Sequence, residues 1–255
     1  MTGRRRWACH SLAVTGASHR RQDQPGADAA ATVSFRSGIV LMVADGAGSS
    51  PLGAEASRLA IESLRRAVSQ SGDQRDRSGG HPQVVTSAED VFYAGVADFL
   101  RRGVGVGEEL KTTLAMVFVN PPWLVHVGIG DAFVVAADRK RQTHLIVTPR
   151  AVGSPRNETE FVTAKAKPRV GVFYDPGWRG VILSTDGLEP FLDEKTLRQG
   201  NSTVSVPWRP AEQVFNNLMT DLRNGSSPEA LGVTLSGSAF QSRKGDDIGI
   251  AVAVR

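Results

Sequence analysis

Four short apolar segments lie close together between Thr112 and Thr148, and they limit the possible folds more than any other feature. They read TTLAMVFV, WLVHVGIG, AFVVAAD and HLIVT, and turn-forming residues separate them. Segments of this length and spacing predict an antiparallel meander. Two amphipathic helices are predicted before them, one at 53–68 and one from an N-cap at Ser87 to about Arg102. Because helices and strands are grouped rather than alternating, the order predicts an α+β fold with mainly antiparallel sheets.

The rest of the chain completes this pattern without a strong domain boundary, so we expect a single domain over residues 1–255. Residues 1–11 are expected to form a loose terminus, and the Pro-rich, charged stretch at 149–180 is expected to form a flap or lid over a site. The other expected strands lie at 7–14, 34–44 and 181–188 and in the closing GDDIGIAVAV, and the other expected helices lie at 188–197 and 210–225.

Composition excludes several classes of protein. The net charge of +4 is too small and too dispersed to indicate a nucleic-acid partner. The single cysteine, Cys9, excludes an intrachain disulfide and a cysteine-rich zinc site, and it fits a cytoplasmic location. No apolar run reaches the roughly 18 residues of a membrane span. A monomer without membrane or nucleic-acid partners is therefore the expectation.

Aspartates stand at the ends of several predicted strands. Asp45 and Asp186 each end an apolar strand in an Asp-Gly pair, and no hairpin partner follows either one. Asp131 follows VHVGIG, and the pair Asp246-Asp247 precedes the closing strand. If these strands are neighbours, the carboxylates converge, and a hard divalent cation such as Mg²⁺ or Mn²⁺ would offset their repulsion. The alternative is that these aspartates cap turns and helix starts.

Six motifs in order resemble the metal-dependent protein phosphatases, the type 2C serine/threonine phosphatase (PPM-type) family, in its bacterial branch. The motifs are TGASHRRQDQPGADAA, VADGAG, KTTLAMVFV, HVGIGDAFVV, LSTDGL and KGDDIGIAVAV, and they span nearly the whole chain. The resemblance implies a four-layer αββα sandwich of two mainly antiparallel sheets flanked by helix pairs. It also implies hydrolysis of phosphoserine or phosphothreonine by direct attack of a metal-bridging hydroxide, with no phosphoenzyme.

The same resemblance implies roles for single residues. Two Mn²⁺ or Mg²⁺ ions would be held by Asp45, the Gly46 carbonyl, Asp186 and Asp246. These three aspartates would take part in catalysis through the metal-bound water.

Three further aspartates are assigned around these ligands. Asp28 would hold metal-bound water without touching the ions itself, and Asp131 with Asp186 would form a third, weaker metal site. Asp247 would support the site or close a turn beside Asp246, and a direct ligand role stays open.

Several positions depart from the family pattern. His19 stands where many members have an Arg that holds the substrate phosphate. A protonated imidazole can do that work, but a loop imidazole bonded to backbone is an equally good interpretation. Lys111, Ala47 and Gly249 replace usual family residues, and Ala132 follows Asp131 where the family has Ser.

Two functions from different classes follow. The first is a Mn²⁺- or Mg²⁺-dependent phosphoprotein phosphatase with a phosphorylated protein substrate and a cognate Ser/Thr kinase. The second is a catalytically weak or inactive family member that binds phosphoproteins or a kinase. Survival of Asp45, Asp186 and Asp246 favours the first.

Overall fold

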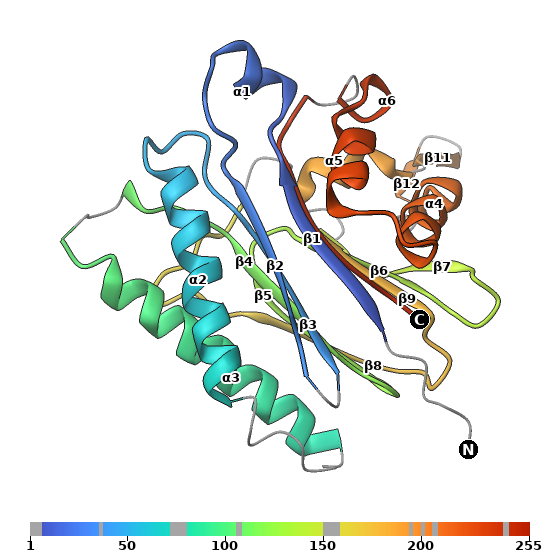
Figure 1. Ribbon diagram of the computed structural model, residues 1–255, viewed down its shortest axis with the longest axis horizontal. Helices are drawn as coiled ribbons and strands as arrows, with labels where there is room; N and C mark the ends of the chain where they lie inside the picture. Colours follow the sequence, from blue (N-terminus) through green and yellow to red (C-terminus); the bar gives the residue numbers. More distant parts are fainter. Residues whose placement is uncertain are drawn as a thin grey trace.

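Two antiparallel sheets of five strands each pack face to face in this protein (Figure 1). The computed structural model describes residues 7–35, 38–71, 81–105, 109–149, 159–193, 196–199, 202–205, 209–241 and 245–255. The first sheet has the order β1-β14-β9-β6-β7, with β1 (Ala8–Val14), β14 (Ile248–Val254), β9 (Gly180–Ser184), β6 (Phe133–Ala137) and β7 (Thr143–Val147). The second has the order β2-β3-β4-β5-β8, with β2 (Asp28–Ser34), β3 (Ile39–Asp45), β4 (Leu114–Asn120), β5 (Trp123–Ile129) and β8 (Arg169–Tyr174).

Helices cover the outer faces of both sheets. Figure 1 shows α2 and α3 over the second sheet, and α4 and α5 over the first. The helices are α1 (Ala17–Arg21), α2 (Gly53–Ser71), α3 (His81–Arg102), the 3-10 helix η3 (Asp186–Phe191), α4 (Glu212–Arg223), α5 (Pro228–Ser236) and α6 (Ser238–Gln241). Two small ribbons pair β10 (Leu192–Asp193) with β13 (Arg209–Pro210) and β11 (Thr196–Gln199) with β12 (Ser202–Ser205). The four-layer αββα arrangement expected from the sequence is confirmed.

Three apolar layers hold these four layers of secondary structure together. Strand β3 contributes side chains to two of them. Its side chains alternate between the layer against α2 and α3, which receives Val40 and Met42, and the layer between the sheets, which receives Leu41 and Val43. Both faces of β3 are therefore buried, which explains its uninterrupted apolar sequence. A third layer packs α4 and α5 against the first sheet around Phe215. Full burial of each such side chain contributes about 1.5–3 kcal/mol.

Helix α2 forms as its periodicity predicts. The expected inner face is buried: Ala60 and Leu64 have no exposed surface, and Leu59 packs against the same core from the edge of that face. Arg58, Arg65 and Glu62 face outward because they fall between the apolar positions of the 3.6-residue repeat. The helix continues to Ser71, so it is longer than expected, and the predicted loop at 69–83 falls mostly outside the described residues.

The predicted single meander is wrong, although all four of its strands are present. β4 pairs with β5 in the second sheet, whereas β6 pairs with β7 in the first. The chain changes sheets at Gly130, whose φ of 109° is open to glycine but strained for other residues. This crossing places Asp131 between the two sheets at one end of the sandwich.

Four further expectations need correction. The strand expected at 34–44 begins only at Ile39, because Ser34 is the last residue of β2. Ser87 is not an N-cap, because α3 already begins at His81, and Val85, two residues before Ser87, packs against the core. The helix expected at 188–197 is only the 3-10 helix η3, because Pro190 has no N–H for a longer helical ladder. Within 149–180, β8 is a strand paired with β5, and residues 150–158 lie outside the described part.

Among the described residues, no helix combines the length and the apolar character that crossing a membrane requires.

Candidate active site

The aspartates predicted to converge lie at one end of the sandwich. Asp28 begins β2 and Asp45 ends β3, and the register of the two strands places these residues directly opposite each other. In the first sheet, β9 ends just before Asp186, and its last residue pairs with Ile250 near the start of β14. Both sheets therefore deliver carboxylates to the same end, which is also where α1 projects (Figure 1).

Asp28 and Asp45 form a buried carboxyl pair. Burial raises the pKa of Asp28 from 3.8 to about 7, and the negative charges of Asp247 and Asp186 act in the same direction. Burial also raises the pKa of Asp45 well above 3.8. The negative charges of Asp28, Asp186 and Asp131 raise it further, each by less than burial does. The hydrogen bond between the two carboxyls lowers the pKa of Asp28 and raises that of Asp45. Burial and mutual repulsion both disfavour two charged carboxylates here, and a cation beside the pair would offset that cost.

Three threonines support this pair, and the sequence interpretation did not single them out. The Thr185 hydroxyl donates to Asp28 Oδ2 at 2.7 Å and accepts from the Gly249 N–H at 2.9 Å. Thr113 Oγ1 accepts the Asp45 N–H, and Thr112 Oγ1 donates to the Asp45 carbonyl, both at 2.9 Å. Their positions in the sequence could have indicated them, since Thr185 directly precedes Asp186, and Thr112 and Thr113 directly precede β4, the strand next to β3.

The glycines of the two Asp-Gly motifs have a steric role. A Cβ atom at Gly46 would overlap the carbonyl oxygen of Gly53, where α2 begins. A Cβ atom at Gly187 would overlap the carbonyl oxygen of Asp247. Each glycine therefore permits two backbone segments to meet behind an aspartate. Within the described chain no hydrogen bond reaches the Gly46 carbonyl, so this oxygen is available to an ion.

Asp131 approaches the pair from the crossing between the sheets. Its charge contributes to the raised pKa of Asp45, so it lies within electrostatic reach of that carboxyl. Its Oδ2 accepts the Thr159 hydroxyl at 2.8 Å, and its buried Oδ1 has no partner among the described residues. Thr159 belongs to the stretch expected to be a flap, so one end of that stretch is tied to the site.

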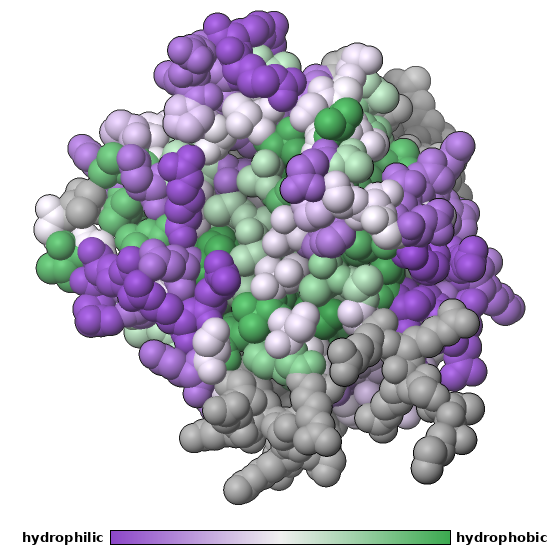
Figure 2. Space-filling model, in the orientation of Figure 1, coloured by the Kyte–Doolittle hydropathy of each residue, from purple (hydrophilic) through white to green (hydrophobic). Residues whose placement is uncertain are grey.

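Asp246 and Asp247 have different surroundings although they are adjacent. Asp246 Oδ1 accepts the N–H of Asp247 at 3.0 Å. Asp247 is buried and bonds to the segment before β2, including Nδ1 of His19 at 2.8 Å. His19 lies in α1, which forms a hydrophilic projection at the top of the molecule in Figure 2. The imidazole is therefore held by a carboxylate, not by backbone as the alternative interpretation expected.

The donor groups at this end fit a hard divalent cation. They are carboxylates and a backbone carbonyl, the oxygen ligands that Mg²⁺ and Mn²⁺ prefer. In the part of the chain that the structure describes, no three His, Cys, Asp or Glu side chains already stand in an arrangement that could hold a metal ion.

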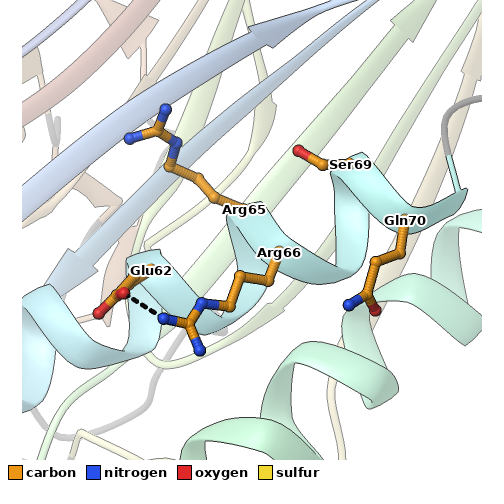
Figure 3. Close-up of a pocket in the computed structure, with 5 residues that line it drawn as sticks. All are labelled: Glu62, Arg65, Arg66, Ser69 and Gln70. Carbon is orange, nitrogen blue, oxygen red and sulfur yellow. Dashed lines mark hydrogen bonds and ion pairs between the residues drawn. The ribbon is translucent and has the colours of Figure 1, made fainter.

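A shallow surface groove elsewhere on α2 is not part of this site. It is lined by Glu62, Arg65, Arg66, Ser69 and Gln70, and Glu62 accepts a hydrogen bond from Arg66 at 2.7 Å (Figure 3). These residues follow Gly53 by nine or more positions, which places them at least ~14 Å further along the helix axis. The contact between Glu62 and Arg66 is an exposed ion pair one turn apart on the helix.

Comparison with known proteins agrees with the fold and the motifs. The profile of the protein phosphatase 2C family matches residues 15–236. No curated protein sequence matches the chain. The solved Ser/Thr phosphatase Stp1 from Staphylococcus aureus has a TM-score of 0.63 at 16% identity, covering 100% of this chain and 99% of that one.

Two structures of the phosphatase PstP are similar to the same degree. The Mycobacterium tuberculosis enzyme PstP/Ppp has a TM-score of 0.61 at 17% identity, with 98% of this chain and 97% of that chain covered. The catalytic domain of PstP in complex with 2 manganese ions has a TM-score of 0.61 at 18% identity, with the same coverage. Because the family profile extends over most of its length, this chain belongs to the protein phosphatase 2C family.

Proposed function

We propose that this protein is a Mn²⁺- or Mg²⁺-dependent phosphatase that hydrolyses phosphoserine and phosphothreonine in proteins. Family membership supports the reaction class, and the manganese ions in the PstP complex support the choice of ion. A phosphorylated protein substrate and a cognate Ser/Thr kinase are the partners that this function would require.

The buried pair of Asp28 and Asp45 is the observation that carries the proposal. A chain gains no stability from two carboxyls forced together away from water, because burial disfavours their charged forms. Such pairs occur where function needs them, at catalytic or metal sites. The charges of Asp186 and Asp131 reach the same pair from the other sheet and from the crossing, so four elements contribute to one acidic centre.

The proposed roles follow from the placement of each group. Asp45, the Gly46 carbonyl, Asp186 and Asp246 would hold two ions, and Asp131 would contribute to a third. When bound, the ions activate water and neutralise charge on the phosphoryl group. Asp28 is held by the Thr185 hydroxyl, and the raised pKa values of Asp28 and Asp45 mean that protons compete with a cation for the pair. Cation affinity should therefore fall as pH falls.

His19 is proposed to contact the substrate phosphate. Its Nδ1 is engaged by Asp247, whereas its Nε2 has no hydrogen-bond partner within the described residues. The two neighbouring arginines of α1 are turned to the protein itself: Arg20 donates to the Thr15 carbonyl, and Arg21 Nε donates to the Ala17 carbonyl at 3.1 Å. Of the three basic residues of α1, only His19 is held by a buried carboxylate of the described chain, which leaves Nε2 in a fixed place.

Phosphate release from a phosphothreonine peptide, with and without Mn²⁺, tests this function. Asp186→Asn should abolish Mn²⁺-dependent release, because it removes a proposed ligand charge at the centre. Asp175→Asn is the matched control, since Asp175 accepts the Gly177 N–H in a turn after β8, at the opposite end of the sheet. Equal rates with and without Mn²⁺, or an active Asp186→Asn variant, would contradict the proposal.

A folded protein that binds Mn²⁺ without releasing phosphate would point to the second candidate, a binding module for phosphoproteins or a kinase. The replacement of the usual Ser and Arg after Asp131 by Ala132 and Phe133, both buried, motivates that candidate. Calorimetric titration with Mn²⁺ separates the two cases from a protein that binds no ion.

A further inference from the structure

The carboxylate of Asp247 accepts three hydrogen bonds from one short segment of chain. Oδ1 accepts the Gly16 N–H at 2.6 Å. Oδ2 accepts the Ala27 N–H at 2.6 Å and pairs with His19 Nδ1 at 2.8 Å. The side chain is 4% exposed, so these contacts are sheltered from water. Both oxygens are therefore engaged by the segment at 16–27.

These contacts close the loop that joins β1 to β2. Gly16 stands at the start of the loop and Ala27 at its end, so one carboxylate fixes both ends and the imidazole between them. Other contacts anchor α1 itself: the Ala17 N–H donates to Gln241 Oε1 at 2.8 Å, and the Ser18 N–H donates to the Gly245 carbonyl at 3.0 Å. Among the described residues, only Asp247 bonds to the imidazole.

A carboxylate bonded to one nitrogen of an imidazole fixes the ring and decides which atom is left for a ligand. Here Nδ1 is held, and Nε2 remains. The His19 side chain is 22% exposed, so a ligand can reach the ring. The charge of Asp247 acts on Asp28, which places the pair of Asp247 and His19 within electrostatic range of the acidic centre.

We propose that Asp247 is a positioning residue that holds His19 with Nε2 toward a phosphoryl oxygen of the substrate, and that it is not a metal ligand. This inference rests on the phosphatase function proposed above. An ion at Asp247 would have to displace the hydrogen bonds that close the loop, whereas an ion at Asp45 would not. The direct ligand role left open for Asp247 by the sequence is the role that this proposal rejects.

A double-mutant comparison tests the proposal. His19→Ala should lower kcat/KM by about 10- to 100-fold, the value of one hydrogen bond to a charged group. Asp247→Ala should lower kcat/KM by a similar factor in the wild-type background, and by no more than about threefold beyond it. In the His19→Ala background it should cost no more than about threefold, because its effect passes through the imidazole. A further tenfold loss in that background would overturn the proposal.

The chain offers a matched control. Asp138 also holds a turn and a histidine: its Oδ1 accepts the Lys140 and Gln142 N–H groups, and its Oδ2 pairs with His144 at 3.2 Å. It lies in the β6–β7 turn, which Figure 1 shows far from α1. Asp138→Ala should therefore leave kcat/KM unchanged. An equal loss of kcat/KM in Asp138→Ala would show that any Asp–His turn has this effect and would overturn the proposal.

A second readout does not depend on turnover. In ¹⁵N-labelled protein with Mg²⁺, the His19 ring resonances should show Nδ1–H in the wild type, and inorganic phosphate should shift Nε2. Asp247→Ala should abolish both signatures. Unchanged His19 resonances in that variant, or no response of wild-type Nε2 to phosphate, would overturn the proposal.

These readouts also distinguish a failure of the phosphatase function from a failure of the positioning role of Asp247. If the wild type releases no phosphate but shows both ring signatures, the phosphatase function fails while the positioning role stands. If Asp247→Ala does not fold, Asp247→Asn carries the test, because its single amide oxygen cannot replace both acceptors. Asp247→Asn should then weaken either the loop contact at Gly16 or the contact to His19, and wild-type values of kcat/KM and of the ring resonances would overturn the proposal.

Discussion

His126→Leu should make the protein less sensitive to acid. His126 lies in the middle of β5, is 2% exposed, and has an Nε2 atom without a hydrogen-bond partner among the described residues. Burial lowers the pKa of His126 from 6.5 to about 3, and the nearby charge of Arg169 acts in the same direction. The folded chain therefore keeps this imidazole neutral where the unfolded chain binds a proton.

The sign and size of the effect follow from this difference. Between pH 6.5 and about 3 the unfolded state binds the additional proton, so the free energy of unfolding falls as pH falls through this range. The full difference corresponds to about 5 kcal/mol, at about 1.4 kcal/mol per pH unit. At about pH 4 the wild type should have lost about 3 kcal/mol through this residue alone, a large share of a typical domain stability.

Urea unfolding at neutral pH and at about pH 4 measures this loss. His126→Leu should lose about 3 kcal/mol less than the wild type between the two conditions, because leucine has a similar size and no proton to bind. His144→Leu is the control, since the His144 side chain is 48% exposed and already in contact with water. Equal acid losses in His126→Leu and the wild type would refute the argument.

Three further predictions concern the core, the site backbone and the ions. Phe215→Ala should lower the free energy of unfolding by about 3–5 kcal/mol in chemical denaturation, because the ring is fully buried against Phe133; a loss below about 1 kcal/mol would contradict this packing. Gly187→Ala should lower Tm strongly, because the added Cβ atom would overlap the Asp247 carbonyl oxygen. Gly48→Ala is the control, since a Cβ atom there has nothing within 4 Å, and equal Tm values for the two variants would refute the steric explanation. Mn²⁺ at about 100 times its Kd should stabilise the wild type by about 2.7 kcal/mol and Asp45→Asn far less; an equal rise in Tm would place the ion elsewhere.

Local patterns predicted most of the strands and the buried faces, because each depends on neighbouring residues. The inner face of α2 follows from a 3.6-residue repeat, and the stop of α4 follows from Gly225, whose φ is 87°. The strand β8 was missed because Arg169 and Gly171 interrupt its apolar pattern, and its partner β5 lies about 45 residues earlier in the chain. Helix α5 was missed because Gly232 weakens its helical signal.

The acidic centre was only partly accessible from the sequence. Strand-end positions and the family motifs indicated Asp45 and Asp186, since an aspartate after a buried strand is visible in one dimension. The contact of Asp28 with Thr185 joins residues 157 positions apart, and that of His19 with Asp247 joins residues 228 apart. No local pattern specifies such pairs, because the packing of one sheet on the other creates them.

The proposed function depends most on whether the carboxylates at the strand ends form a metal centre. Anomalous diffraction from crystals grown with Mn²⁺ tests it directly. We predict two manganese peaks bridged by Asp45, with Asp186 and Asp246 as ligands and Asp247 still bonded to His19. Manganese peaks only at other surfaces, with none beside Asp45, would contradict the proposed metal centre.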